Sequence, residues 1–239
     1  MNEGVISTEL GLPGIPSAAE DVMVARNVSL AELTGARLHL AHISTAGSVR
    51  MVREAKARGL KVTAEACPHH FTLTEELTRG YNTHAKMNPP LRTSQDVQAI
   101  KDGLRDGTID VIATDHAPHA TQEKQQEFTE APFGIVGLET ALPLTLALVE
   151  EGVLTLESAV DKLATAPAKA FSINAGTLTV GAPADVAIVD PGLEWEVDPS
   201  RFRSKSRNTP FAGWKVKGRV TTTIVSGRVV FELNPGRPA

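Results

Sequence analysis

The sequence predicts an α/β fold in which parallel β-strands alternate with α-helices, followed by a small β module. Over the first 175 residues, short apolar segments rich in β-branched residues alternate with longer segments whose apolar residues recur every three or four positions. From residue 176 onward, short strand-like segments are separated by tight turn signals. Strands and helices that alternate over short loops are typical of parallel β/α units, whose chemistry collects at the carboxyl ends of the strands.

Each helix is recognised by its periodicity and by signals at its ends. The segment Ser17-Ala18-Ala19-Glu20 has the pattern of a capping box, and Gly35 and Gly59 follow the predicted ends of the first two helices. Helices are predicted at residues 17–33, 47–58, 94–105, 138–151 and 156–164. Strands are predicted at residues 37–43, 60–66, 85–88 and 109–114.

The chain is expected to form two domains. Residues 1–175 make the β/α part, and residues 176–239 make the small β module with its final loop and strands. Within the module, residues 176–190 and 223–230 are predicted to be short strands. The dipeptide Ser226-Gly227 has the composition of a hairpin corner.

Composition limits the classes of protein to which this chain can belong. With 239 residues, 41% of them hydrophobic, and a net charge of −4, the chain can bury a sizeable core and offers no basic surface for nucleic acid. Its lone cysteine, Cys67, excludes an internal disulfide and fits a reducing cytoplasm. No apolar run approaches the about 18 residues of a membrane span. A cytoplasmic protein without nucleic-acid or membrane partners is therefore expected.

The most informative motif lies where the predicted strand at residues 109–114 ends. There Asp115 is followed by His116 and His119, and an acid beside imidazoles can bind a divalent cation and exchange protons with its water. The structural alternative is a loop aspartate that caps the next turn. However, His42 and Asn88 also fall at strand ends, and three ligand-capable groups in such positions favour a metal-assisted hydrolase.

Several motifs resemble those of the amidohydrolase superfamily and, within it, the dihydroorotases of the long bacterial type. The motifs are AHIST at 41–45, TAEACPHH at 63–70, KMNPPLR at 86–92, ATDHAPH at 113–119, APFG at 131–134, GLET at 137–140 and NTPF at 208–211. They cover nearly the whole chain, and NPPLR, TDHAPH and APFG are specific within the superfamily. The resemblance implies a partial TIM-type (β/α)8 metal-dependent hydrolase barrel with a small C-terminal β module.

The resemblance also implies an activity and a site. The activity is zinc-dependent hydrolysis of a cyclic amide, interconverting dihydroorotate and N-carbamoyl-L-aspartate in pyrimidine biosynthesis. It makes His42 a zinc ligand and Asp115 both a zinc ligand and the catalytic acid/base, with one or two Zn²⁺ ions per site. The implied substrate contacts are Asn88, His119, Phe133 and Gly134.

The other histidines are expected to stay outside the site. Neighbouring residues of a strand point to opposite faces, so at most one of His69 and His70 faces the site, and the resemblance carries no ligand there. By the same periodicity His39 points away from the face that carries His42. His84 is expected to be solvated.

Other ligands of the family have no counterpart in this chain. The seven histidines contain no His-x-His pair, and the bridging Lys or Asp and a further histidine of the family's middle strands are also missing. The sequence is therefore expected to be the C-terminal part of such an enzyme and to be neither stable nor active alone. An open barrel leaves strand edges exposed, and catalytic zinc typically has three protein ligands. The implied partners are a small-molecule substrate, aspartate transcarbamoylase and, at full length, further copies of the same chain.

Two alternatives remain open. The first is a related cyclic amidase acting on hydantoin or allantoin, against which the motifs around Asn88 and His119 argue. The second is a non-catalytic subunit that resembles a dihydroorotase and acts as a scaffold for aspartate transcarbamoylase. The presence of His42 and Asp115 argues against this second function. The polar loop at residues 120–131 is suited to closing over a substrate.

Overall fold

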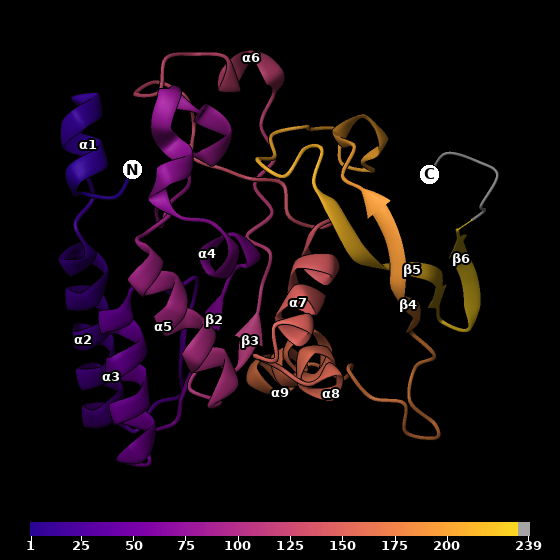
Figure 1. The fold of residues 1–239 in the computed structure, drawn as a ribbon. Helices are drawn as coiled ribbons and strands as arrows, with labels where there is room; N and C mark the ends of the chain where they lie inside the picture. The colour runs from indigo at the N-terminus through magenta and orange to yellow at the C-terminus, as the bar shows by residue number, and fades with distance from the viewer. Residues whose placement is uncertain (234–239) are drawn as a thin grey trace.

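The computed structural model describes residues 1–233, which form a layered α/β region followed by an antiparallel sheet (Figure 1). The helices are α1 (Val5–Leu10), α2 (Ser17–Thr34), α3 (Ala46–Ala57), α4 (Pro68–Thr72), α5 (Ser94–Arg105), α6 (Thr121–Lys124), α7 (Ala141–Glu150), α8 (Leu156–Val160) and α9 (Ala166–Phe171). Short 3-10 turns η1 (Glu75–Tyr81), η2 (Thr83–Ala85) and η4 (Pro199–Arg201) and a π-turn η3 (Asp161–Thr165) complete the helical elements. The strands are β1 (Leu38–Leu40), β2 (Val62–Ala66), β3 (Val111–Ile112), β4 (Val186–Glu196), β5 (Lys215–Val225) and β6 (Arg228–Glu232).

The first sheet contains β1, β2 and β3 in that order, and all of its pairs are parallel. Leu38 pairs with Val62, and Glu65 pairs with Val111, so the three strands run in register toward one edge. Most residues of β2 and both residues of β3 are buried, as is typical of parallel strands, whereas two of the three residues of β1 are only partly buried. The loops that follow β1 and β3 therefore begin at the same edge of the sheet.

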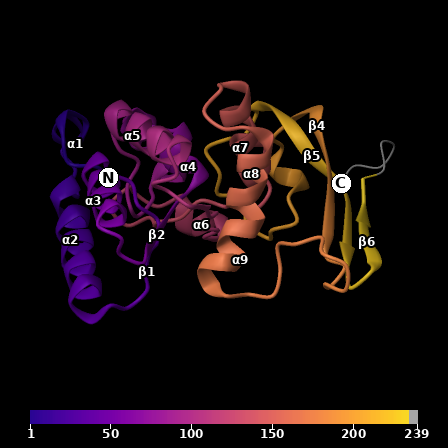
Figure 2. The same ribbon diagram turned by 90° about the horizontal axis from the view of Figure 1, so that it is seen from below.

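Helices cover the parallel sheet on one flank and separate it from the second sheet on the other. Helices α2, α3 and α5 lie side by side, and α3 contacts β2 (Figure 1). Helix α7 packs on β5, between the two sheets in both views (Figure 2). This approach is close, because a Cβ added at Gly218 of β5 would lie 2.1 Å from a methyl carbon of Leu146 in α7.

The second sheet is antiparallel, with the order β4, β5 and β6. Ser226 and Gly227 connect β5 to β6 with φ angles of 50° and 75°, the conformation that a tight two-residue hairpin requires. The predicted hairpin corner is therefore confirmed. The strand predicted from residue 176 is wrong in its first part, because β4 begins only at Val186.

One large hydrophobic core extends from the parallel sheet to the segment between β4 and β5, where Val197, Phe202 and Phe211 contribute to it. The division into domains at residues 175 and 176 stays a prediction, and residues 234–239 of the second predicted domain lie outside the described residues. Within the described chain, none of the helices is long and apolar enough to cross a membrane.

One predicted strand and one predicted helix end are wrong, and each lies next to a proline. Residues 85–88 do not form a strand, since Pro89 and Pro90 have no N–H to donate to a ladder. Instead the carbonyl of Lys86 accepts a hydrogen bond from the Gly134 N–H at 3.0 Å. The helix predicted to end at residue 164 continues through a π-turn to Phe171, and Pro167 at the start of α9 removes one donor where the hydrogen-bond spacing changes.

The predicted capping box at the start of α2 is also wrong. Pro16 is the N-cap, and no side chain caps this helix. The carboxylate of Glu20 instead accepts hydrogen bonds from the backbone N–H groups of Ser44 (2.8 Å) and Thr45 (3.1 Å). Glu20 therefore holds the loop that carries the chain from β1 past His42 into α3.

Candidate functional site

His42 and Asp115 lie just beyond the carboxyl ends of β1 and β3, and their side chains face one another. The His42 Nε2 is 3.8 Å from the Asp115 Oδ1, and the two side chains are 33% and 25% exposed. Both residues have left-handed backbone conformations, with φ angles of 54° and 44°. Such conformations cost free energy outside glycine and concentrate at functional sites, although His and Asp are among the residues that adopt them most readily.

Glu65, on the strand between them, fixes the orientation of His42. Its carboxylate accepts hydrogen bonds from His42 Nδ1 at 2.7 Å and from His39 Nε2 at 2.9 Å. An ionised carboxylate only accepts, so the proton of neutral His42 is on Nδ1 and the lone pair of Nε2 is directed toward Asp115. This is the arrangement by which a carboxylate prepares an imidazole to bind a metal.

The prediction that His39 and His42 point to opposite faces is wrong, because His42 lies past the end of β1 and both rings reach Glu65. The sequence analysis also missed Glu65 as a site residue. The signal was present: a glutamate within the apolar segment Val62–Ala66 is buried on folding, and a buried carboxylate needs partners.

The three groups perturb one another's protonation. Burial alone would raise the pKa of Glu65, but the hydrogen bonds from His39 and His42 outweigh it and lower the pKa to about 2. The hydrogen bond to Glu65 raises the pKa of His42, with burial opposing it and Asp115 adding to it. Burial raises the pKa of Asp115, and His42 partly offsets this shift. An accessible imidazole nitrogen and a carboxylate with a raised pKa together can bind a cation and exchange a proton.

A second group of predicted residues meets on the loop that follows Asp115. His119 Nε2 donates to the Phe133 carbonyl at 2.8 Å, and Gly134 packs directly on the His119 ring. The buried Asn208 joins them: its amide donates to the carbonyls of Ala117 (2.9 Å) and Gly134 (3.0 Å). The side-chain oxygen of Asn208 accepts a hydrogen bond from the backbone N–H of His119 at 3.1 Å. Asn208 belongs to a family motif, but its role as the connection between these loops was not foreseen.

Asn88 is linked to these loops only through the backbone of a neighbouring residue. It is exposed and makes no side-chain hydrogen bond within residues 1–233, but it follows Lys86 by two positions, and the Lys86 carbonyl binds Gly134. The polar loop at residues 120–131 is anchored by Lys124, whose ammonium donates to the carbonyls of Pro132 (2.8 Å) and Gly134 (3.2 Å). Whether this loop closes over a substrate stays a prediction.

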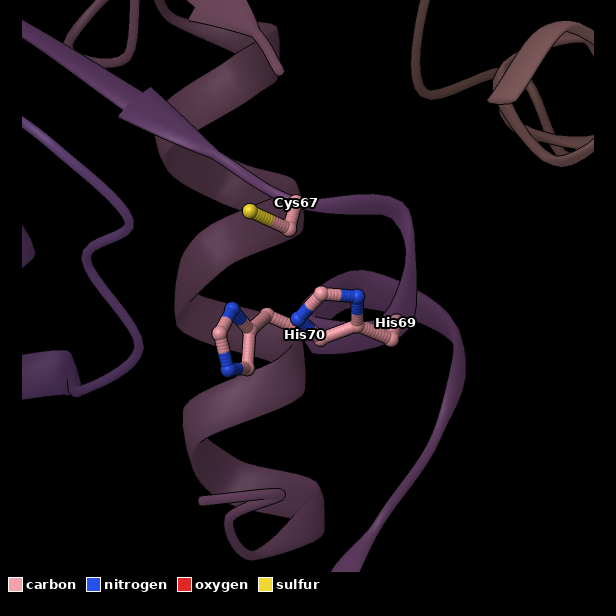
Figure 3. Close-up of side chains that lie close together, drawn as sticks. All are labelled: Cys67, His69 and His70. Carbon is pink, nitrogen blue, oxygen red and sulfur yellow. The ribbon is translucent and has the colours of Figure 1, made fainter. Parts of the chain in front are cut away.

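Cys67, His69 and His70 form a separate buried cluster directly after β2 (Figure 3). The prediction that the two histidines lie on a strand is wrong, because Pro68 begins helix α4, and both side chains are buried. One ligand atom from each of the three residues lies within 4.8 Å of the others. The Cys67 Sγ is also 3.4 Å from His42 Nδ1, so the cluster lies behind the site of His42 and Asp115.

His84 is half-buried rather than solvated, and burial lowers its pKa. Its Nδ1 lies against protein and finds no hydrogen-bond partner within the described residues. The short turn η2, which contains His84, brings the ring close enough to Lys124 for that ammonium to contribute to the pKa shift.

Comparison with known proteins identifies a family. The sequence model of the Amidohydrolase family matches residues 2–230. The dihydroorotase of Syntrophotalea carbinolica is 61% identical over 234 residues, which are 98% of this chain and 55% of that protein. The dihydroorotase of Syntrophus aciditrophicus is 58% identical over 97% of this chain and 54% of its own length. The chain thus spans about half the length of the curated relatives it matches, and the resemblance inferred from the motifs is confirmed.

Solved structures have the same fold. The L-hydantoinase (dihydropyrimidinase) of Arthrobacter aurescens superposes with a TM-score of 0.84 at 33% identity, over 89% of this chain and 49% of that one. The dihydropyrimidinase of Brevibacillus agri gives the same TM-score at 27% identity, over 91% of this chain and 49% of its own. The predicted fold class, a partial metal-hydrolase barrel of α/β type with a C-terminal β module, is confirmed.

Proposed function

The chain belongs to the amidohydrolase family, and on that premise we propose that it carries the C-terminal part of the active site of a dihydroorotase. The protein would reversibly convert dihydroorotate and water to N-carbamoyl-L-aspartate. The observation that carries the proposal is the pairing of His42 and Asp115 at two strand ends, with Glu65 holding His42 in the ligating tautomer. Relatives that share 58–61% identity across almost the whole chain bear the name of this enzyme.

The donors of this site fit a zinc ion. His42 Nε2 and the Asp115 carboxylate are nitrogen and oxygen ligands of the kind zinc accepts, and both are partly exposed. Within residues 1–233 the Asp115 carboxylate has one ion-pair contact, to His42 Nε2 at 3.8 Å, which leaves its oxygens able to bind a cation. Catalytic zinc typically has three protein ligands. We propose that the remaining donors come from the part of the whole protein that corresponds to the other half of its relatives.

Asp115 would act as the acid/base. A zinc ion bound here would polarise the ring carbonyl and lower the pKa of a coordinated water to about 7. Asp115 accepts the proton of the attacking water as the new C–O bond forms. It then delivers that proton to the ring nitrogen as the amide C–N bond breaks.

The loops beyond Asp115 would bind the substrate. His119 donates from Nε2 to the Phe133 carbonyl, so its Nδ1, which lies 3.6 Å from the Glu123 carboxylate, is the ring nitrogen left to contact a ligand. We propose that His119, Asn88 and the backbone at Phe133 and Gly134 hold the dihydropyrimidine ring and its carboxylate. Asn208 would act by positioning His119 and Gly134 relative to one another.

The test is a reconstitution with a panel of substrates. The purified chain is assayed alone and mixed with a separate polypeptide covering the first half of the Syntrophotalea carbinolica dihydroorotase. We expect dihydroorotate hydrolysis and the reverse cyclisation in the mixture, and neither from the chain alone. Preference for hydantoin or allantoin would overturn the substrate assignment. Binding to aspartate transcarbamoylase without hydrolysis in any mixture would support a scaffold instead.

A hydantoinase is the second candidate, favoured by the fold likeness to the Arthrobacter aurescens enzyme. The identity of 33% to that protein, against 61% to a dihydroorotase, makes it the weaker one. The cytoplasmic location, the homo-oligomer and the association with aspartate transcarbamoylase stay predictions.

A further inference from the structure

We propose that Cys67, His69 and His70 form a second metal site, distinct from that of His42 and Asp115, which binds zinc or a softer divalent cation. The first observation is that the three side chains converge. One ligand atom from each lies within 4.8 Å of the other two, and their residues are 0%, 2% and 3% exposed. Tetrahedral zinc separates nitrogen and sulfur ligands by about 3.3–3.8 Å, so coordination needs a shift of about 1 Å.

The second observation is that two buried imidazole nitrogens of this cluster have no hydrogen-bond partner. Within residues 1–233, neither His69 Nε2 nor His70 Nδ1 is satisfied, although nearly all buried polar atoms of folded proteins are. Each is a polar atom removed from water without a compensating hydrogen bond, which is unfavourable. A cation that accepts both lone pairs would remove that cost.

The tautomer of His70 follows from its other nitrogen. His70 Nε2 lies 2.9 Å from the carbonyl oxygen of Pro89, which only accepts, so the ring proton is on Nε2. His70 Nδ1 is then an unprotonated lone pair, and Figure 3 shows a ring nitrogen of His70 on the side that faces the sulfur of Cys67. This carbonyl contact is the kind of second interaction that holds ligating histidines in place.

The donor set defines the class of ligand. Two neutral imidazoles and one thiolate suit zinc and softer ions and do not suit magnesium or calcium. When the ion binds, the metal–sulfur bond replaces the S–H bond of Cys67, and the proton passes to solvent. Burial, with the carboxylates of Asp115 and Glu65 adding to it, raises the pKa of the Cys67 thiol, so the bound ion itself must displace this proton.

The chain offers a specific probe for this site, because Cys67 is its only cysteine. A thiolate-to-metal charge-transfer band can arise from no other residue, whereas His42 and Asp115 cannot produce one. The purified 239-residue chain is titrated with Co²⁺ and its near-ultraviolet absorption is recorded. This readout is independent of catalysis, so it stands or falls separately from the proposed function.

We expect a charge-transfer band that saturates at one ion per chain and is absent from Cys67→Ser. Replacing His69 or His70 by Ala should weaken Co²⁺ binding at least 10-fold, whereas the control His84→Ala should leave it unchanged. If those variants do not fold, His42→Gln decides the matter, since it should retain the band. Absence of the band from the wild-type chain, or its loss in His42→Gln, would overturn the proposal.

Discussion

The substitution Glu65→Gln tests how the site is organised. The carboxylate of Glu65 accepts hydrogen bonds from His39 and His42 while only about 5% of the residue is exposed. A glutamine of the same shape has no charge and only one acceptor oxygen, so its NH2 group would face the ring nitrogen of the other histidine. Hydrogen bonds to charged groups contribute about 1.5–3 kcal/mol and neutral ones about 0.5–1.5 kcal/mol. Two weakened bonds therefore predict a loss of about 2 kcal/mol in the free energy of unfolding.

That loss corresponds to a fall of about 4–8 °C in Tm for a chain of this size. Zinc affinity should fall about 10- to 100-fold, because a glutamine no longer enforces the tautomer in which His42 Nε2 is unprotonated. Tm is measured by differential scanning calorimetry and affinity by competition with a chelator. Glu54→Gln, on the exposed face of α3, is the matched control and should change neither. Unchanged Tm and unchanged affinity in Glu65→Gln would refute the role assigned to this carboxylate.

Three further predictions concern the loops around the site. Gly134→Ala should destabilise the protein by about 1–3 kcal/mol and displace His119, since the added Cβ would lie 2.6 Å from its ring and φ is +154°. Asn208→Ala removes three hydrogen bonds of a buried side chain and should lower the free energy of unfolding by about 2–3 kcal/mol. Burial, assisted by a neighbouring lysine, lowers the pKa of Lys124 to about 8. Between pH 8 and about 10.5 this lysine is protonated in the unfolded chain but largely deprotonated in the folded one. Its contribution to the free energy of unfolding therefore rises with pH over this range, and Lys124→Met should lack this pH-dependent increase.

Each of these predictions has a refuting result, and the first also has a matched control. Gly192→Ala, where the nearest atom to the new Cβ is 3.6 Å away, should be nearly neutral, and an equal effect at both glycines would contradict the packing argument. For Asn208, chemical denaturation that gives an unchanged midpoint and slope would contradict its connecting role. For Lys124, parallel stability curves of wild type and variant from pH 7 to 10.5 would show that its pKa is ordinary.

The edge of the sheet at which the site forms could be predicted from sequence. His42 and Asp115 each come after an apolar segment, and parallel strands bring the loops at their carboxyl ends to one edge of a sheet. The hairpin at Ser226 and Gly227 was predictable for a similar reason, because its turn type depends on the local residues alone.

Long-range pairing was not predictable in the same way. Glu65 becomes a partner of His42 only once β1 and β2 align, and Asn208 meets His119 across 89 positions. A capping motif gives no warning that Glu20 will bind Ser44 in another element. Periodicity also fails where proline changes the backbone, as it does for His69 and His70 after Pro68.

The central claim is that Asp115 transfers the proton in cyclic amide hydrolysis, and one rate comparison tests it most directly. Dihydroorotate hydrolysis is measured in the reconstituted mixture with wild type, Asp115→Asn and the surface control Asp161→Asn. We predict that Asp115→Asn loses about 10²- to 10⁴-fold in kcat, the usual contribution of a positioned acid/base, and that Asp161→Asn retains the wild-type rate. A rate for Asp115→Asn within a few-fold of wild type would contradict the account.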